Sequence, residues 1–205
     1  MTKVVLATRN AHKVEELREI LADVCGDLGL EIVGLDAFPD VPEVVEDGVT
    51  FEQNAILKAA AAAQVTGLPA LADDSGLEVD ALDGAPGVRT RRYAGEDASD
   101  DENNVKLLRA LDGLPPEQRG AHYVCSLALA MPGEALITVR GECFGRIATG
   151  PRGSGGFGYD PIFEPEGEPP GGRTFGQWSA EDKNRVSHRA RAARAMTPHL
   201  VDRGF

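Results

Sequence analysis

The sequence predicts an α/β fold with a mixed β-sheet and flanking helices. Strand-like and helix-like segments alternate in the first half of the chain, and two long β-rich runs follow around Pro132-Gly133. Parallel strands early and a hairpin late combine into a mixed sheet. The 205 residues contain no repeat and no low-complexity linker, so we expect one domain over residues 1–205.

The first half supplies the expected parallel part of the sheet. An apolar run at 4–7 indicates a buried strand, and the polar turn 8–13 leads into a helix whose apolar residues recur at helical spacing. A short strand at 31–34 and an acidic loop at 36–48 follow. Thr50 then opens an alanine-rich helix with the pattern of a capping box.

The middle of the chain begins with a buried strand at 70–73, and an acidic turn beside Gly76 is one alternative for the residues that follow it. Ser99 opens a second capping box, and its helix is expected to end at Gly113. The β-rich runs at 121–130 and 135–148 form the predicted hairpin.

The last third is rich in glycine and ends in a helix. A glycine-rich loop covers 150–158, and a Pro/Gly-rich exposed stretch covers 164–172. Ser179 is expected to cap one final helix that runs to about Met196.

Composition excludes several classes of protein. Twenty-one basic and 33 acidic residues give a net charge of −12, which argues against a general nucleic-acid binder but leaves a single nucleotide open. No apolar run approaches about 18 residues, so we expect no membrane span. Cys25, Cys125 and Cys143 lack disulfide or zinc spacing. We therefore expect reduced thiols and a cytoplasmic protein.

The turn Thr8-Arg9-Asn10-Ala11-His12-Lys13 is the first candidate site. A helix N-terminus presents free N–H groups and the positive end of the helix dipole, which suits phosphate, and Lys13 adds charge. A plain helix cap with surface cations is the alternative.

Adjacent carboxylates at the end of the buried strand are the second candidate site. Asp73 and Asp74 are costly there without a cation or hydrogen-bond partner, and strand alternation turns them to different faces. One of them can bind a metal or activate water. Glu46-Asp47 can add a ligand, and such oxygen ligands suit Mg²⁺ or Mn²⁺. Solvated charges and an acidic turn are the alternatives.

The glycine-rich loop matches GxGxxG between Gly153 and Gly158 but does not predict a dinucleotide-binding fold. That fingerprint must open a helix, whereas β-prone residues follow here. Phe157 and Tyr159 in this loop can stack on a base. A tight turn that feeds a core aromatic residue is the alternative.

The final helix carries a cluster of basic residues. Nucleic-acid binding is one interpretation, but interleaved aromatic residues are missing, and cations also favour helix C-terminal turns. The cluster comprises Lys183, Arg185, His188, Arg189, Arg191 and Arg194.

Taken together, these segments resemble the inosine/xanthosine triphosphate pyrophosphatase family, and the resemblance spans nearly the whole chain. The matching segments are VVLATRNAHKVEEL, EDGVTFEQNAILKA, LADDSGLEVDALDGAPGVRTRRYAG, GGFGYDPIF and KNRVSHRARA. The resemblance implies two lobes with a central nucleotide-binding cleft, a homodimer, and Mg²⁺-dependent cleavage of deaminated purine nucleoside triphosphates (dITP, ITP, XTP) to monophosphate and pyrophosphate.

The resemblance also implies roles for individual residues. Asp74 is the expected proton acceptor and, with Glu46, a metal ligand, and Lys13 is the second expected catalytic residue. The expected nucleotide contacts are Thr8, Arg9, Asn10, Ala11, His12, Lys13, Asn54, Lys58, Ser75, Phe157, Gly158, Tyr159, Asp160, Lys183, His188 and Arg189.

Donors on Arg189 and His188 are expected to favour a 6-keto purine over adenine. Arg91 departs from the family pattern, in which small residues are common. Two alternatives remain: the related Maf nucleotide pyrophosphatases, whose opening turn is usually serine-rich with paired arginines, and an inert nucleotide-binding regulator.

Overall fold

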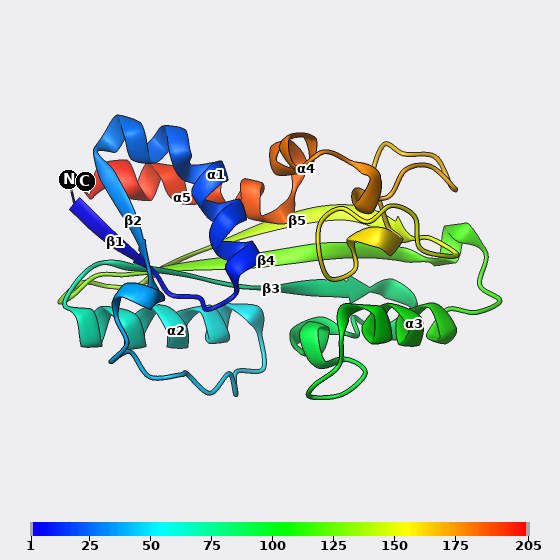
Figure 1. The fold of residues 1–205 in the computed structure, drawn as a ribbon, viewed down its shortest axis with the longest axis horizontal. Helices are drawn as coiled ribbons and strands as arrows, with labels where there is room; N and C mark the ends of the chain where they lie inside the picture. Colours follow the sequence, from blue (N-terminus) through cyan, green and yellow to red (C-terminus); the bar gives the residue numbers. More distant parts are fainter. Residues whose placement is uncertain (1, 204–205) are drawn as a thin grey trace. The chain divides into compact units, whose positions relative to one another are not determined.

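A six-stranded mixed sheet organises the computed structural model, which describes residues 2–203 (Figure 1). The strand order is β2-β1-β3-β4-β5-β6. β1 pairs in parallel with β2 and β3, whereas β5 pairs antiparallel with β6, so the predicted mixed sheet is confirmed. The strands are β1 (Thr2–Leu6), β2 (Leu30–Gly34), β3 (Ala70–Val79), β4 (Gly120–Ala130), β5 (Ile137–Ile147) and β6 (Phe163–Pro165).

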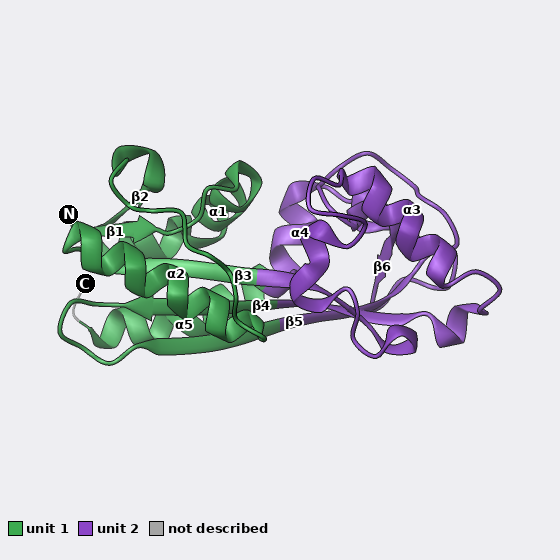
Figure 2. Ribbon diagram, turned by 90° about the horizontal axis from the view of Figure 1, so that it is seen from below, with its two compact units in different colours: residues 1–74, 125–141, 189–205 green, residues 75–124, 142–188 purple. Residues whose placement is uncertain are grey.

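The chain divides into two compact units (Figure 2). Among the described residues, unit 1 comprises 2–74, 125–141 and 189–203, and unit 2 comprises 75–124 and 142–188. Strands β3, β4 and β5 each contribute residues to both units. The α-helices are α1 (Ala11–Leu28), α2 (Phe51–Thr66), α3 (Asp100–Ala110), α4 (Ala180–Val186) and α5 (His188–Asp202).

In unit 1 the sheet is covered by α1 and α5 on one face and by α2 on the other (Figure 1). Strand alternation sorts the side chains by size, because neighbouring residues point to opposite faces. Larger residues such as Leu6 and Leu71 pack with α1 and α5, and small residues such as Ala70 and Ala72 pack with alanines of α2. The alanine contacts on the α2 side allow this helix to lie close to β3.

The predicted starts of α1 and α2 are confirmed by their caps. The Asn10 side chain accepts a hydrogen bond from the backbone N–H of Lys13, and the Thr50 side chain accepts one from Gln53. The expected capping box at Thr50 is only half formed. The Gln53 Oε1 atom accepts from the backbone N–H of Val49 instead, so it ties the acidic loop to α2.

Unit 2 has its own core of aromatic and aliphatic residues, centred on Phe163 and Phe175. The capping box at Ser99 is complete, as the sequence predicts. Buried Arg119 donates to the carbonyl oxygens of Leu111, Ile147 and Ala148 and so links the end of α3 to β5.

Two predicted elements differ from expectation. The strand expected at 70–73 continues as β3 to Val79, because its pairing within the sheet overrides the local turn preference, and the alternative of an acidic turn beside Gly76 is therefore wrong. The single helix expected from Ser179 is two helices, because Ser187 is extended (ψ 158°) and separates α4 from α5. After GxGxxG the chain enters a short 3-10 turn and then β6, so the rejection of a dinucleotide fingerprint is confirmed.

The cysteines are free thiols: Cys125 and Cys143 are buried and Cys25 is half-buried. Burial raises the pKa of the Cys125 thiol. Among residues 2–203, every helix is too short or too polar to cross a lipid bilayer.

Candidate active site

The carboxylates of Asp73 and Asp74 are adjacent in β3 but contact different elements. Asp73 follows the face that packs on α1 and α5, and Asp74 follows the face that packs on α2. This separation is the consequence of strand alternation that the sequence analysis anticipated. Each carboxylate has its own basic partners.

Asp73 lies at the centre of a buried cluster of charges. Its Oδ2 atom is 3.1 Å from Nζ of Lys13 and 3.3 Å from Nε of Arg189. Nη1 of Arg189 is 2.8 Å from Oε2 of Glu16, three residues after Lys13 on α1. Burial lowers the pKa of Arg189, but the attraction of Asp73 and Glu16 outweighs burial and raises it. The guanidinium therefore stays charged and holds both acidic side chains.

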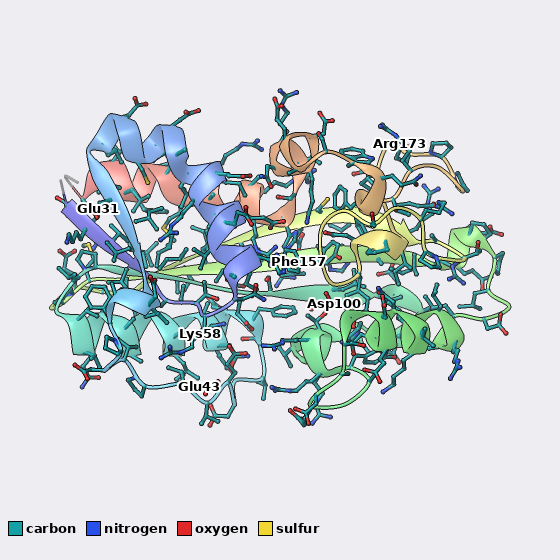
Figure 3. All side chains as sticks on the ribbon, in the orientation of Figure 1. Glu31, Glu43, Lys58, Asp100, Phe157 and Arg173 are labelled. Atoms are coloured by element: carbon teal, nitrogen blue, oxygen red, sulfur yellow. The ribbon has the colours of Figure 1, made fainter. Side chains whose placement is uncertain are left out.

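Asp74 shares a lysine with the acidic loop. Nζ of Lys58 on α2 (labelled in Figure 3) lies 2.9 Å from Oδ1 of Asp74 and 2.9 Å from Oε1 of Glu46. Nδ2 of Asn54 donates to Oδ2 of Asp74 at 3.2 Å. Burial raises the pKa of Asp74, although Lys58 and Lys13 act against the shift. Burial lowers the pKa of Lys58, but Asp74, Asp73 and Glu46 outweigh it and raise the pKa.

The turn before α1 is structured by its own polar side chains. Oγ1 of Thr8 accepts from the backbone N–H of Asn10, and Oδ1 of Asn10 accepts from that of Lys13. Arg9 donates to the carbonyl of Val41. Ala11 and His12 are exposed on the first turn of α1, where the helix dipole favours an anion.

The carboxylate oxygens of Asp74 and Glu46 are ligands of the kind that a hard divalent cation prefers. Glu46 and Asp74 present carboxylate oxygens to one common cation, the Lys58 ammonium. Within residues 2–203, groups of three or more His, Cys, Asp or Glu side chains arranged for a metal are absent. Two protein carboxylates match the way Mg²⁺ is usually held, because Mg²⁺ keeps water ligands and takes further oxygens from substrate phosphates.

In unit 2, the loop around Phe157 is fixed by α3. The backbone N–H of Gly158 donates to Oδ2 of Asp100 at 2.7 Å, and Nδ2 of Asn104 donates to the Gly158 carbonyl at 3.0 Å (Asp100 and Phe157 are labelled in Figure 3). The Tyr159 hydroxyl donates to the carbonyl of Thr90 at 2.8 Å. These bonds hold the loop backbone and leave Phe157 half-buried.

The carboxylate of Asp160 binds two residues that are expected to contact the base, Phe157 and Lys183. Its carboxylate accepts from the Phe157 backbone N–H at 3.0 Å, from Nζ of Lys183 at 2.6 Å and from the Tyr123 hydroxyl at 3.2 Å. Nζ of Lys183 lies 5.0 Å from the centre of the Phe157 ring. His188 stacks on Tyr123 with ring centres 4.7 Å apart.

Each unit thus gathers part of the expected site. Unit 1 holds the turn before α1, Glu46, Asn54, Lys58, Asp74 and Arg189, and unit 2 holds Ser75, the Phe157–Asp160 loop, Lys183 and His188. The sequence patterns did not predict the part of Glu16 or the anchoring role of Asp73. The Lys13–Glu16 spacing, which puts both residues on one face of α1, was the available signal for Glu16.

The fold and this pairing of carboxylates with lysines define an α/β protein with a mixed sheet and an acidic–basic site built on β3. Residues 4–199 match the model of the Ham1 family, and the chain belongs to that family.

Close relatives match along their full length. The chain is 52% identical to the dITP/XTP pyrophosphatase of Geobacter sulfurreducens over 205 residues, which is 100% of both chains. It is 51% identical to the dITP/XTP pyrophosphatase of Streptomyces coelicolor over 97% of this chain and 96% of that one. A solved HAM1 protein from Coxiella burnetii superposes with a TM-score of 0.86 at 41% identity, covering 98% of this chain and 100% of that one.

Proposed function

We propose that this protein hydrolyses the deaminated purine nucleoside triphosphates dITP, ITP and XTP to the monophosphate and pyrophosphate. The observation that carries the proposal is the full-length similarity to relatives named dITP/XTP pyrophosphatases. The neighbouring carboxylates on β3 and the turn before α1 offer groups that this reaction needs.

Glu46 and Asp74 would hold the metal ion, Mg²⁺ or Mn²⁺. When bound, the ion neutralises phosphate charge and lowers the pKa of a coordinated water. The turn Thr8–Lys13 would bind the triphosphate through backbone N–H groups of α1 and the Lys13 ammonium. Lys58 already contacts both carboxylates and would add a further positive charge to the site.

Asp74 would accept the proton of the attacking water. A carboxylate near that water can take its proton as a general base. Lys13 would stabilise the charge that develops on the leaving pyrophosphate. Asp73, paired with Lys13 at 3.1 Å, keeps that ammonium oriented.

The residues of unit 2 would bind the base. Phe157 offers a ring for stacking, and Lys183 and His188 offer donors for the 6-keto oxygen that hypoxanthine and xanthine share. Arg189 is also an expected nucleotide contact, and its Nε and Nη1 atoms contact Asp73 and Glu16. We propose that Arg189 supports Lys13 through Asp73.

Product analysis by chromatography tests the proposal directly. ITP, dITP, XTP, ATP and GTP are each incubated with the protein and Mg²⁺, and we expect monophosphate and pyrophosphate from the first three. Diphosphate with orthophosphate would refute cleavage between the α- and β-phosphates. Binding without turnover would favour a nucleotide-binding regulator.

We also propose that the protein is a homodimer that acts on free nucleotides of the cytoplasm. The family resemblance supports the dimer, and the net charge of −12 argues against nucleic acid as a partner. Light scattering coupled to size-exclusion chromatography measures the oligomeric state, and a mass near 21.7 kDa would contradict the dimer.

A further inference from the structure

Asn54 connects two parts of the chain that both carry expected metal ligands. The side chain lies in the first turn of α2 and is 2% exposed. Oδ1 accepts from the backbone N–H of Gly48 at 2.9 Å, and Nδ2 donates to Oδ2 of Asp74 at 3.2 Å. Because the acceptor must face the N–H and the donor must face the carboxylate, both bonds fix a single orientation of the amide. One side chain therefore links the acidic loop to β3.

Gly48 makes this link possible because it has no side chain. A Cβ atom at this position would lie 2.5 Å from Oδ1 of Asn54 and 2.8 Å from Cβ of Gln53. Both distances are too short for carbon contacts, so any larger residue would push the loop away from α2. Glu46 lies two residues before Gly48 in the same loop, so a displacement of the loop would also move the Glu46 carboxylate.

Lys58 lies one turn after Asn54 on the same face of α2. Its ammonium contacts Oδ1 of Asp74, whereas Asn54 contacts Oδ2. The two oxygens of Asp74 therefore have separate partners from one helix. This leaves Oδ1 of Asp74 and Oε1 of Glu46 directed at the same cation.

We propose that Asn54 is a positioning residue, which holds Glu46 and Asp74 at the separation at which both carboxylates bind one cation. This role replaces the direct phosphate contact expected from the sequence. The inference rests on the proposed function insofar as that cation is the metal ion of the reaction. Outer groups that orient metal ligands typically change metal affinity or activity by about 10- to 100-fold when they are removed.

The test compares Asn54→Ala with Gln53→Ala. Gln53 is the matched control because its side chain also ties the acidic loop to α2, through the Val49 N–H at 2.8 Å, and that bond involves no carboxylate. Isothermal titration calorimetry with Mn²⁺ and nucleotide-free protein measures metal affinity. We expect Asn54→Ala to weaken Mn²⁺ binding at least about 10-fold and Gln53→Ala to resemble the wild type.

Steady-state kinetics separate positioning from phosphate contact. In Asn54→Ala we expect the Mg²⁺ concentration for half-maximal activity to rise in parallel with the Mn²⁺ dissociation constant, with a smaller change in KM for ITP at saturating Mg²⁺. A large rise in KM with unchanged Mn²⁺ affinity would overturn the inference and indicate direct phosphate contact. If the alanine variant fails to fold, Asn54→Leu removes both hydrogen bonds at similar volume, and the same criteria apply.

Failure of the inference is distinguishable from failure of the proposed function. If the wild type releases no pyrophosphate from ITP with Mg²⁺, the proposed function fails and the metal role assigned to Asn54 fails with it. If the wild type is active with Mg²⁺ and binds Mn²⁺, but Asn54→Ala binds Mn²⁺ as tightly, only the inference fails.

Discussion

Replacing Asp73 with asparagine should destabilise the protein far more than the same change at Asp74. Asp73 is 0% exposed and contacts two cations, and the Arg189 side chain is only 4% exposed. Removing one partner of a buried pair costs about 3–5 kcal/mol, because an uncompensated charge remains. The cost should lie near the lower end, since Glu16 still pairs with Arg189 and the Lys13 side chain, 14% exposed, reaches water.

The expected shift is large enough for a thermal assay. A loss of about 3 kcal/mol lowers Tm by about 6–12 °C in a protein of this size. Asp74→Asn should cost less than about 1 kcal/mol, because burial already opposes the charged form of this carboxylate. Its activity should nevertheless fall by at least about 10²–10⁴-fold, and more than that of Asp73→Asn. Calorimetry and pyrophosphate release on both variants check this. Equal Tm values, or a milder loss of activity in Asp74→Asn, would refute the separation of roles.

Three further predictions concern the metal, Arg189 and an alkaline transition. Treatment with EDTA should abolish activity, and Mg²⁺ or Mn²⁺ should restore it without zinc; full activity after chelation and dialysis would contradict the oxygen-ligand site. Arg189→Ala should lower kcat/KM for ITP and for ATP in equal proportion, because its guanidinium contacts Asp73 and Glu16; a selective loss for ITP would mean that Arg189 contacts the base. Burial raises the pKa of Tyr159, so its contribution to stability should be complete below about pH 10 and decline at higher pH as the unfolded chain ionises. The stability difference between the wild type and Tyr159→Phe, measured with denaturant, should therefore shrink from neutral to alkaline pH, and a constant difference would contradict the buried hydroxyl.

Local patterns in the sequence predicted those parts of the fold that depend on neighbouring residues. The helix that follows the turn at 8–13, the capping box at Ser99 and the buried strand around Ala72 depend on side chains within a few positions, and all three are confirmed. The strand expected to end at Asp73 continues to Val79, because sheet pairing determines the backbone conformation there. Ser187 separates α4 from α5, and no proline or glycine at that position indicates the break in the sequence.

The contacts within the candidate site depend on residues that are far apart in the chain. Asn54 and Asp74 are separated by 20 positions, and Arg189 and Asp73 by 116. The residue types identified the basic side chains as candidates, but the type of a residue alone could not predict that Arg189 contacts Asp73 and Glu16. Gly48 shows the same limit, since the reason for a glycine there is the Asn54 side chain against which it packs.

Strand alternation explains why two neighbouring aspartates cannot exchange roles. Asp73 contacts cations from α1 and α5, and the partners of Asp74 among the bonds described above, Asn54 and Lys58, come from α2. A shift of β3 by one residue would turn every side chain to the opposite face of the sheet and place large Leu71 against the alanines of α2. The packing of small residues on one side and large residues on the other therefore opposes that shift. The same hydrophobic pattern that stabilises unit 1 thus keeps the carboxylate that anchors Lys13 apart from the carboxylate proposed to activate water.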